Sequence, residues 1–449
     1  MLTLRHACHE TALFNSCPGA IYTSINGPLY QLNDPFHAWS VTTQQTTPND
    51  SRASGTPHSD TTNSTWGRPV AVLALGSFAM GTDSFVLAGI LPQIAHGLKE
   101  STSAAGQVIT AFALTYALAA PFLAAFTSKL PRKPLMAFAL ALFVVANLAS
   151  AAAPTLPLLL AARVAAGFGA ALYTPNASAA AAALAGPARR GQALAVILGG
   201  LTVGTVFGVP AGTAIGQHVS WQASLVFVAA VGLVALLGLL ATLPNLPIPP
   251  AVPMSARLGV LARGRVLAMV GFMLLASASS IMVYTYIAKV LGETAHTTGT
   301  SLAVTLLVWG IGGTVGSFGS GWLTDRWGAH RTLLLAVGLL AVTLAALTVA
   351  TSIVPVMIVM ALNGAAGWAV ATPNNHRLTA LVPELPSVVI SFNSSGIYLG
   401  QAVGAGLGGI LLGHGMAVRP FCIAGAVIAV VAIALHLLIS RSAKEVRTA

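Results

Sequence analysis

The sequence predicts an all-helical membrane protein with twelve transmembrane helices, arranged as two parallel six-helix repeats. Three observations lead to this fold class. Hydrophobic residues make up 55% of the 449 positions and charged residues only 7%, against roughly 25% charged residues in a soluble domain. Twelve apolar segments are long enough to cross a bilayer, which takes about 20 residues. Short motifs in the first half of the chain recur in the second half.

The first 65 residues are polar and rich in Ser, Thr, Asn and Pro. This composition cannot bury a core, so we expect a disordered tail; a start codon assigned too far upstream would give the same pattern. The twelve predicted spans follow, at residues 69–92, 104–128, 134–153, 156–185, 192–216, 221–243, 265–290, 299–323, 330–350, 353–381, 387–413 and 417–440.

Lysine and arginine residues set the predicted orientation. With the N-terminus in the cytoplasm, the inner connections and the C-terminal tail hold fourteen cations, whereas the outer loops hold three, Lys99, Lys289 and Arg419. Cytoplasmic loops are the ones enriched in such cations, so both termini are predicted to be cytoplasmic in a multi-pass protein of the inner (plasma) membrane. The cations lie in short breaks between apolar runs rather than on a soluble basic module, so the net charge of +11 does not indicate a nucleic-acid partner.

The two halves of the chain repeat at nearly one offset. Six spans in each half make the repeats parallel, related by an axis along the membrane normal, as in transporters that rock two bundles about a central site. We therefore predict bundles at residues 66–243 and 265–440, a proline-rich semi-rigid linker at 244–264 and a cytoplasmic tail at 441–449. The recurring residues are Thr127-Ser128-Lys129 and Thr324-Asp325-Arg326 (offset 197), Thr174-Pro175-Asn176 and Thr372-Pro373-Asn374 (198), and Gly200, Gly204, Gly208 and Gly212 with Gly396, Gly400, Gly404 and Gly408 (196).

The fifth predicted span carries a glycine at every fourth position from Gly200 to Gly216. One face of this helix is therefore bare backbone, which lets a neighbouring transmembrane helix approach closely. Pro210 predicts a kink that neighbouring helices can tolerate within a bilayer. On spacing alone, a plain helix-packing stripe and a functional motif are both consistent with this pattern.

The segment Gly321–Gly328 (GWLTDRWG), followed by His330 and Arg331, resembles the loop signature between spans eight and nine of the major facilitator superfamily. Over about residues 68–440, the chain resembles this superfamily and, within it, the twelve-span drug:proton antiporters. The first-half loop departs from the signature, because Ser128 stands where the family usually has Asp. The resemblance implies that both loops gate transport, through Lys129, Arg132 and Lys133 in the first and through Gly321, Asp325, Arg326, Gly328 and Arg331 in the second.

Two further segments carry the resemblance. Leu160-Ala161-Ala162-Arg163, followed by Gly167 and Gly169, is similar to the fourth-span motif of the family. The glycine stripe resembles its fifth-span antiporter motif, which accompanies export by exchange, so the resemblance implies efflux. Residues 81–85, 88–94 and 105–107 resemble bacterial exporters of chloramphenicol and of arabinose-type sugars. The residues implied by the antiporter motif are Gly200, Gly204, Gly208, Pro210 and Gly212.

Asp83 is the one acidic residue well inside any predicted span, and Arg163 is the one basic residue. At 1.5 Å per residue, both lie roughly 10 Å from the outer face of a bilayer of about 30 Å. An unpaired charge there would be costly, so we expect the two to pair. Our hypothesis is that Asp83 carries the coupling proton and Arg163 sets its affinity; the alternative is a static pair that locks two helices. In the family, the acid of the first-span motif often stands one residue later, at Ser84.

A central binding site would place a few polar groups among aromatic and apolar walls. Tyr284 and Tyr286 have suitable side chains, but they lie near an outer end, where interfacial aromatic belts are expected. His376 and Arg377 end the tenth span and are interpreted as topology anchors. The candidate substrate contacts, each of which could instead be a helix-packing residue, are Tyr116, Trp309, Asn363, Asn393, Tyr398 and Gln401.

The predicted function is export of a small amphipathic, chloramphenicol-like molecule in exchange for protons. A sugar or nucleoside exporter of the same fold is an alternative within transport, and a non-transporting membrane sensor or scaffold is an alternative of another class. No nucleophile motif or phosphate loop is present, so we expect no enzyme, catalytic residue or cofactor, and the proton gradient as the energy source. Scattered cysteines and histidines indicate no metal site. The expected partners are the substrate, protons and the lipid bilayer, and we expect a monomer.

Overall fold

A computed structural model describes residues 66–127, 129–246 and 254–448, apart from the side chains of 124, 125 and 441–448. The predicted disordered tail and residues 247–253 of the predicted linker lie outside this part of the chain. Every regular element within it is helical: Gly67–Leu98 (α1), Thr102–Ala105 (α2), Gln107–Phe126 (α3), Arg132–Ala151 (α4), Leu156–Val203 (α5), Gly204–Gly208 (η1), Val209–His218 (α6), Trp221–Thr242 (α7), Met254–Leu261 (α8), Gly264–Thr285 (α9), Ile287–Ala295 (α10), Gly299–Trp327 (α11), Ala329–Ala346 (α12), Ile353–Trp368 (α13), Ala371–Leu381 (α14), Pro386–Gly413 (α15) and Val418–Thr448 (α16).

Eleven helical stretches of the described residues are long and apolar enough to span a membrane. One of them, Leu156–His218, is 63 residues long and contains both the fourth and the fifth predicted spans. Gly186 divides it, because its backbone (φ 69°, ψ 176°) is not helical and lies in a region open mainly to glycine. The predicted twelve passages are therefore present.

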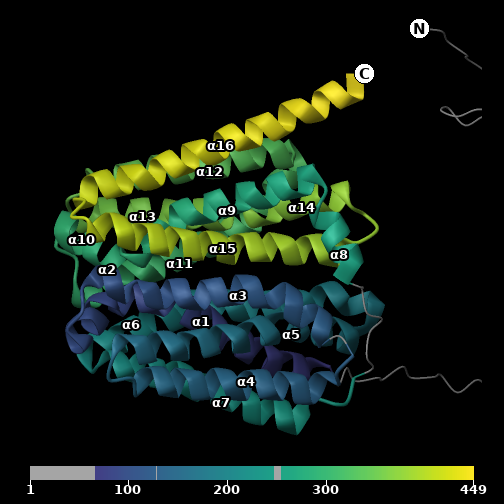
Figure 1. Ribbon diagram of the computed structural model, residues 1–449, viewed down its shortest axis with the longest axis horizontal. Helices are drawn as coiled ribbons and strands as arrows, with labels where there is room; N and C mark the ends of the chain where they lie inside the picture. Colours follow the sequence, from purple (N-terminus) through teal and green to yellow (C-terminus); the bar gives the residue numbers. More distant parts are fainter. Residues whose placement is uncertain (1–65, 128, 247–253, 449) are drawn as a thin grey trace, which may run out of the picture. The chain divides into compact units, whose positions relative to one another are not determined.

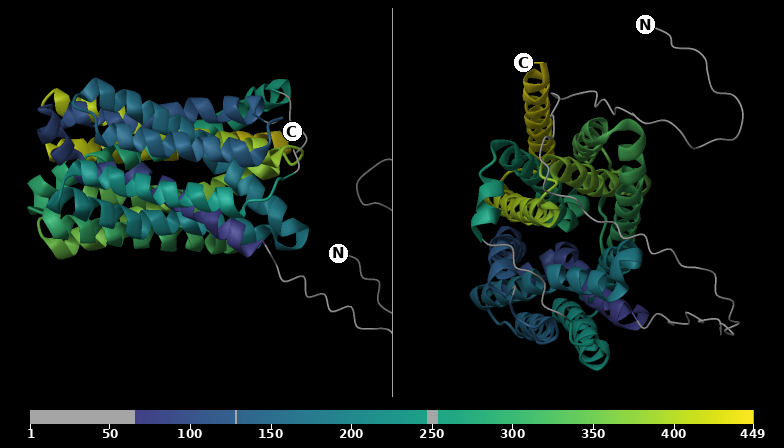
Figure 2. Two further views of the ribbon diagram at one scale, coloured as in Figure 1. Left: turned by 90° about the horizontal axis from the view of Figure 1, so that it is seen from below. Right: turned by 90° about the vertical axis from the view of Figure 1, so that its right-hand side faces the viewer.

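The helices of the two halves form separate groups. Figure 1 shows α1 and α3–α7 together, and α9 with α11–α16 beside them. Seen along the helices in the right-hand view of Figure 2, the same two groups face each other. We call them the first and second bundle. The predicted linker joins them and includes the short helix α8, which the proline-rich sequence did not predict.

The glycine stripe packs on α1 in a four-residue register. A Cβ added at Gly200 would lie 2.2 Å from the carbonyl oxygen of Ala74, and one at Gly204 would lie 2.3 Å from that of Phe78. Since real Cβ atoms do not approach this closely, only glycine allows the contact. The register continues along both helices: Gly208 meets Thr82, Gly212 meets Val86 and Gly216 meets Ile90.

The second bundle repeats this packing residue for residue. Gly400 of α15 lies against Leu274 of α9, and Gly404 lies against Ala278. Both partners of each contact are displaced by 196 positions from their first-half equivalents. The internal repeat is thus a repeat of helix contacts, and the two halves share one scaffold.

Pro210 has a more local effect than a simple kink. Residues Gly204–Gly208, which end two positions before Pro210, form the π-helix η1. A proline lacks the N–H that would continue the α-helical bonding and its ring crowds the preceding turn, and a π-turn is one way to absorb this. Thr205 and Val206 of η1 contact Gly310 of α11, so the π-turn lies where the two bundles meet.

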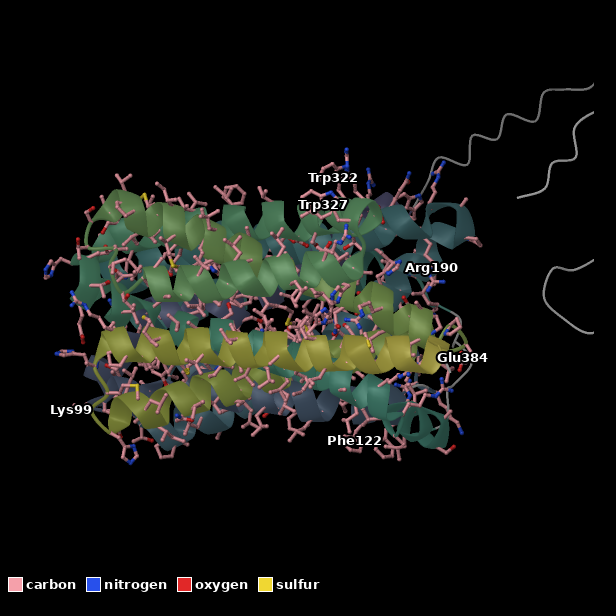
Figure 3. All side chains as sticks on the ribbon, turned by 90° about the horizontal axis from the view of Figure 1, so that it is seen from above. Lys99, Phe122, Arg190, Trp322, Trp327 and Glu384 are labelled. Atoms are coloured by element: carbon pink, nitrogen blue, oxygen red, sulfur yellow. The ribbon has the colours of Figure 1, made fainter. Side chains whose placement is uncertain are left out.

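Figure 3 labels residues at both ends of the bundles. Lys99 marks one end, which we call the Lys99 end, and Arg190 and Glu384 mark the opposite end, which we call the linker end. Between the ends, large apolar side chains face outward: Phe122 is 54% exposed and Trp322 is 59% exposed. Such a surface suits lipid rather than water, as expected of a multi-pass membrane protein.

Candidate functional site

Asp83 of α1 and Arg163 of α5 form a bidentate ion pair inside the first bundle. The two terminal nitrogens of Arg163 each donate to one carboxylate oxygen of Asp83 at 2.9 Å. Each residue is 1% exposed. The pair expected from the depths of the two residues is therefore formed, in the planar two-bond geometry that makes guanidinium–carboxylate pairs strong.

Two other helices complete the surroundings of Arg163. The amide oxygen of Asn147 on α4 accepts a hydrogen bond from Arg163 Nη1 at 3.2 Å, and the guanidinium carbon lies 4.7 Å from the ring centroid of Phe112 on α3. Asn147 Nδ2 donates in turn to the carbonyl of Phe143 at 3.0 Å. Arg163 Nε is buried without a hydrogen-bond partner. The cation is thus held by three groups, while one of its donors is left unsatisfied.

A row of neutral hydroxyl groups lies beside this ion pair, where the bundles meet. The side chain of Tyr398 on α15 lies close to those of Ser84 and of Tyr116 on α3, and Tyr116 also lies close to Thr174 of α5. Asp83 acts electrostatically on Tyr398. Adjacent residues of α1 therefore serve different purposes: Asp83 points into the first bundle, and Ser84 points toward the second.

Phe85, the next residue, belongs to an aromatic cluster that joins the bundles. Its ring centroid lies 5.6 Å from that of Tyr284, 5.5 Å from that of Trp309 and 6.0 Å from that of Trp368. Tyr284 and Trp309 are 4.2 Å apart. The indole N–H of Trp309 is buried without a partner. A buried donor of this kind is available to a ligand that carries an acceptor.

The interfacial position expected for Tyr284 and Tyr286 is wrong. Tyr284 is 3% exposed and donates to the carbonyl oxygen of Phe85 at 3.4 Å, and Tyr286 is fully buried and donates to that of Ala405 at 3.0 Å. Depth along a span does not determine which way a side chain points around the helix axis, and both rings point inward.

The remaining candidate substrate contacts are separated from the aromatic cluster. Asn363 donates to Thr343 of α12 at 3.2 Å, and Asn393 accepts from Asn374 of α14 at 2.7 Å; both are buried within the second bundle. Gln401 is buried one turn beyond Tyr398 on α15. The structure thus brings together Tyr116 and Tyr398 and places Trp309 in the neighbouring aromatic cluster. The side chains of Asn363 and Asn393 instead bond to other helices of the second bundle.

The predicted gating residues lie at the linker end. Gly328 separates α11 from α12 with φ 82°, a value that favours glycine. Arg326 lies over the ring of Trp322, 5.4 Å from its centroid, and Gly321, Asp325 and Arg331 lie in the same region of the chain. In the first-half loop, Lys129 is exposed and Arg132 is buried at the start of α4, with Lys133 next to it. Ser128 lies outside the described residues.

Contacts between the bundles close the half of their interface toward the Lys99 end. Ser103 of α2 donates to the carbonyl oxygen of Gly409 on α15. His218, at the end of α6, lies 3.3 Å from the hydroxyl of Thr300 on α11. A Cβ added at Gly106 would overlap the hydroxyl of Tyr286. Together with the aromatic cluster, these contacts hold the bundles together from mid-depth to the Lys99 end.

The sequence did not single out Asn147, Phe85 or Trp368. After Arg132 and Lys133 at its start, α4 contains one further Asn, Gln or charged residue, which is Asn147. A lone amide in an apolar span is a signal that could have indicated it. Aromatic residues are common in membrane helices, so Phe85 and Trp368 carry no such distinction until the neighbouring helices are known.

Comparison with known proteins identifies the family. The model of the Major Facilitator Superfamily matches residues 73–386. YbcL of Bacillus subtilis strain 168, an uncharacterized MFS-type transporter, is 33% identical over 85% of this chain and 97% of its own length. A chloramphenicol resistance protein of Streptomyces lividans is 32% identical over 77% of this chain and 89% of its own. The inward-facing, unoccupied structure of a bacterial homolog of the human lysosomal transporter Spinster has the same fold (TM-score 0.67, 18% identity, covering 84% and 97% of the two chains).

Proposed function

The chain belongs to the Major Facilitator Superfamily, and on this premise we propose that it exports a small amphipathic molecule in exchange for protons. The observation that carries the proposal is the buried ion pair of Asp83 and Arg163. It places one ionisable acid next to the interface along which two bundles would rock. Intramembrane ionisable groups commonly mark ion or proton pathways.

The chemistry of coupling follows from the pair. While Arg163 bonds both oxygens of Asp83, the carboxylate is stabilised in its charged form. If rocking of the bundles draws the guanidinium away, the buried carboxylate loses its cation and its neutral form becomes favoured, so a proton binds. Return of Arg163 releases that proton. An inward proton gradient, worth about 2.3 kcal/mol per charge per 100 mV, would then drive export.

The bundle interface supports an uncharged or weakly polar substrate. Its side chains are the aromatic cluster and the tyrosine hydroxyls, and the neighbouring carboxylate is turned away and neutralised by Arg163. Aromatic rings and a free indole N–H suit a solute with a planar apolar part and a hydrogen-bond acceptor. The similarity to a chloramphenicol resistance protein agrees with a substrate of this kind.

A sugar or nucleoside is the second candidate substrate. The observation that favours it is the hydroxyl row of Ser84, Tyr116, Thr174 and Tyr398, because neutral hydroxyls can both donate to and accept from a polyhydroxylated solute. In either case we propose a monomer in the inner membrane. The cation-rich connections favour a cytoplasmic position for the linker end and both termini.

Proton movement in inside-out vesicles tests the proposal. Vesicles with an acidified lumen receive amphenicols, dyes, sugars or nucleosides, and a lumenal pH dye reports proton release. We expect release with one class for the native chain, none for Asp83→Asn, and native behaviour for Glu293→Gln, which alters an exposed carboxylate at the Lys99 end. Protein in the membrane is quantified for each variant. A native response from Asp83→Asn would make the ion pair structural, and silence of the native chain with every class would favour a sensor or scaffold.

A further inference from the structure

His436 is a buried histidine in the most apolar span of the chain. It lies on α16, where the most apolar 18-residue window within Val418–Ser440 has a mean hydropathy of 2.8, and it is 1% exposed. Its ring packs against Phe272 of α9, with the centroids 5.1 Å apart. It is far along the chain from Asp83 and belongs to the other bundle, so the coupling chemistry above does not involve it.

Hydrogen bonds connect His436 to two further helices. Arg377 Nη1 of α14 lies 2.8 Å from His436 Nδ1, and His436 Nε2 lies 2.8 Å from His330 Nδ1 at the start of α12. The two imidazole rings are stacked, with centroids 4.8 Å apart and planes at 19°. The chain Arg377–His436–His330 therefore ties α14, α16 and α12 together, and we call it the histidine bridge.

Counting protons shows which charge state this bridge requires. A guanidinium can only donate, so Nδ1 of His436 must offer its lone pair to Arg377. The single proton of a neutral His436 is then on Nε2 and is donated to Nδ1 of His330, which must also be unprotonated. Both bonds therefore form only when the two imidazoles are neutral and hold these tautomers.

One added proton breaks the bridge. On His436, it would occupy Nδ1 and face the N–H of Arg377, donor against donor and cation beside cation. On His330, the added proton would occupy Nδ1 and face the Nε2–H of His436. If His436 then carried its own proton on Nδ1 instead, its Nε2 could accept from His330. Its Nδ1 could, however, no longer accept from Arg377. No arrangement of the extra proton keeps both 2.8 Å contacts.

The charges around His436 are all basic among the described residues. Arg377 and His330 act on it directly, and no carboxylate forms an ion pair with it among the described side chains. The carboxylates at the linker end, Asp325 and Glu384, are exposed, and Glu384 is paired with Arg263. α15 and α10 also touch α16, but α15 has no charged residue and those of α10 are at the Lys99 end. The described basic residues on the other helices around His436 are Arg265 of α9, His330 and Arg331 of α12, and His376 and Arg377 of α14.

We propose that His436 and His330 form a second proton-binding site, in the second bundle, and that binding a proton there releases α12 and α14 from α16. Because α12 starts directly after Gly328, release would loosen the loop that holds the predicted gating residues of this half. The ligand is a proton from the linker side of the membrane, and the site is independent of Asp83 and of what the chain transports.

Deuterium exchange of the full-length protein in lipid nanodiscs tests this site without any transport assay. Exchange is measured between about pH 8 and about pH 4 and is corrected for the chemical exchange rate. The range extends below that of a free histidine, because burial and basic neighbours disfavour an added charge on His436. We expect exchange at the start of α12 and the end of α14 to rise severalfold toward the acidic side. A native protein with no such rise would overturn the proposal.

Variants identify the groups responsible. In His436→Gln combined with His330→Asn, the glutamine can accept from Arg377 and donate to the asparagine oxygen, so the bridge can form but cannot titrate. We expect exchange independent of pH in this variant, and the native rise in His376→Gln, which alters an exposed histidine beside Arg377. Should the double variant keep the native pH dependence, the histidine bridge is not the proton site. Thermal unfolding at neutral pH confirms that each variant is folded, and the native measurement stands by itself if one is not.

Discussion

The rings of Tyr116 on α3 and Tyr398 on α15 are stacked across the bundle interface, with their centroids 3.6 Å apart and their planes at 24°. This stack is a direct contact between the first and second bundles at mid-depth, and Tyr398 lies close to Ser84 beside the buried ion pair. A movement of α15 away from α3 must break it. The stack therefore couples the separation of the bundles to the surroundings of Asp83.

Removing this stack should shift the balance between conformations. Aromatic pairs contribute about 0.5–1.5 kcal/mol beyond the burial of their area, so Tyr398→Ala should reduce the population with a closed Lys99 half about two- to tenfold relative to others. Distances between spin labels at Lys99 and Arg419, on the two bundles, report this population. Phe122→Ala removes an exposed ring from the same helix α3 and should leave the distances unchanged. Unchanged distances in Tyr398→Ala would mean that the stack does not hold the bundles together.

Breaking the buried ion pair should destabilise the protein strongly. Asp83→Asn leaves Arg163 as a buried cation without its carboxylate, which costs about 3–5 kcal/mol, and thermal unfolding in detergent should show a matching loss. Asp83→Asn combined with Arg163→Gln removes both charges and should recover a large part of that loss. The exposed pair of Arg263 and Glu384 provides the comparison, because Glu384→Gln should leave unfolding unchanged. Equal losses in the single and double variants would show that the unpaired cation is not the cause.

Two adjacent glycines, one on the stripe and one beside it, should respond in opposite ways to alanine. A Cβ at Gly200 would lie 2.2 Å from Ala74 O, whereas one at Gly199 meets nothing within 4 Å. We expect Gly200→Ala to lower the free energy of unfolding by about 1–3 kcal/mol through overpacking. Gly199→Ala should be neutral or stabilising by up to about 1 kcal/mol, since alanine is the better helix former. Gly400→Ala tests the repeat, because its Cβ would lie 2.4 Å from Leu274 O and that of its equivalent Gly204 would lie 2.3 Å from Phe78 O, so the loss should match that of Gly204→Ala.

The unpartnered indole of Trp309 should affect binding more than folding. A buried donor without a partner costs about 1–3 kcal/mol, so Trp309→Phe should be no less stable than the native chain without substrate. If the N–H donates to the substrate, affinity for the transported compound should fall about tenfold, the equivalent of one hydrogen bond. Isothermal titration calorimetry measures this affinity, because its signal does not depend on tryptophan fluorescence. Trp327→Phe, at an exposed indole, is the control, and an unaltered affinity in Trp309→Phe would exclude a role for the indole N–H.

Much of the scaffold followed from the sequence, because apolar length determines which segments can cross a membrane and repeated glycines determine how closely helices pack within it. The pairing of Asp83 with Arg163 followed from their depths. Rotation about the helix axes did not follow, which is why Tyr284 and Tyr286 were wrongly expected at the interface. The cluster around Phe85 draws on four helices, and the histidine bridge on three. Such groupings depend on tertiary packing that no single segment encodes. The roles of Asp83 and Arg163 in proton coupling stay predictions.

The matched register of the two bundles also bears on how the chain came to its present length. The offset between equivalent residues is 196 at the first helix pair, 197 at Thr127 and 198 at Thr174, and it returns to 196 at Gly200. If the halves descend from a duplicated gene, single-residue insertions and a compensating two-residue deletion account for these steps. Each of these changes in offset falls between two of the matched positions, in a stretch of chain that contains a connection between helices. One residue added within α1 would turn all later side chains by about 100° and misalign every glycine contact beyond it, so only the connections could change in length.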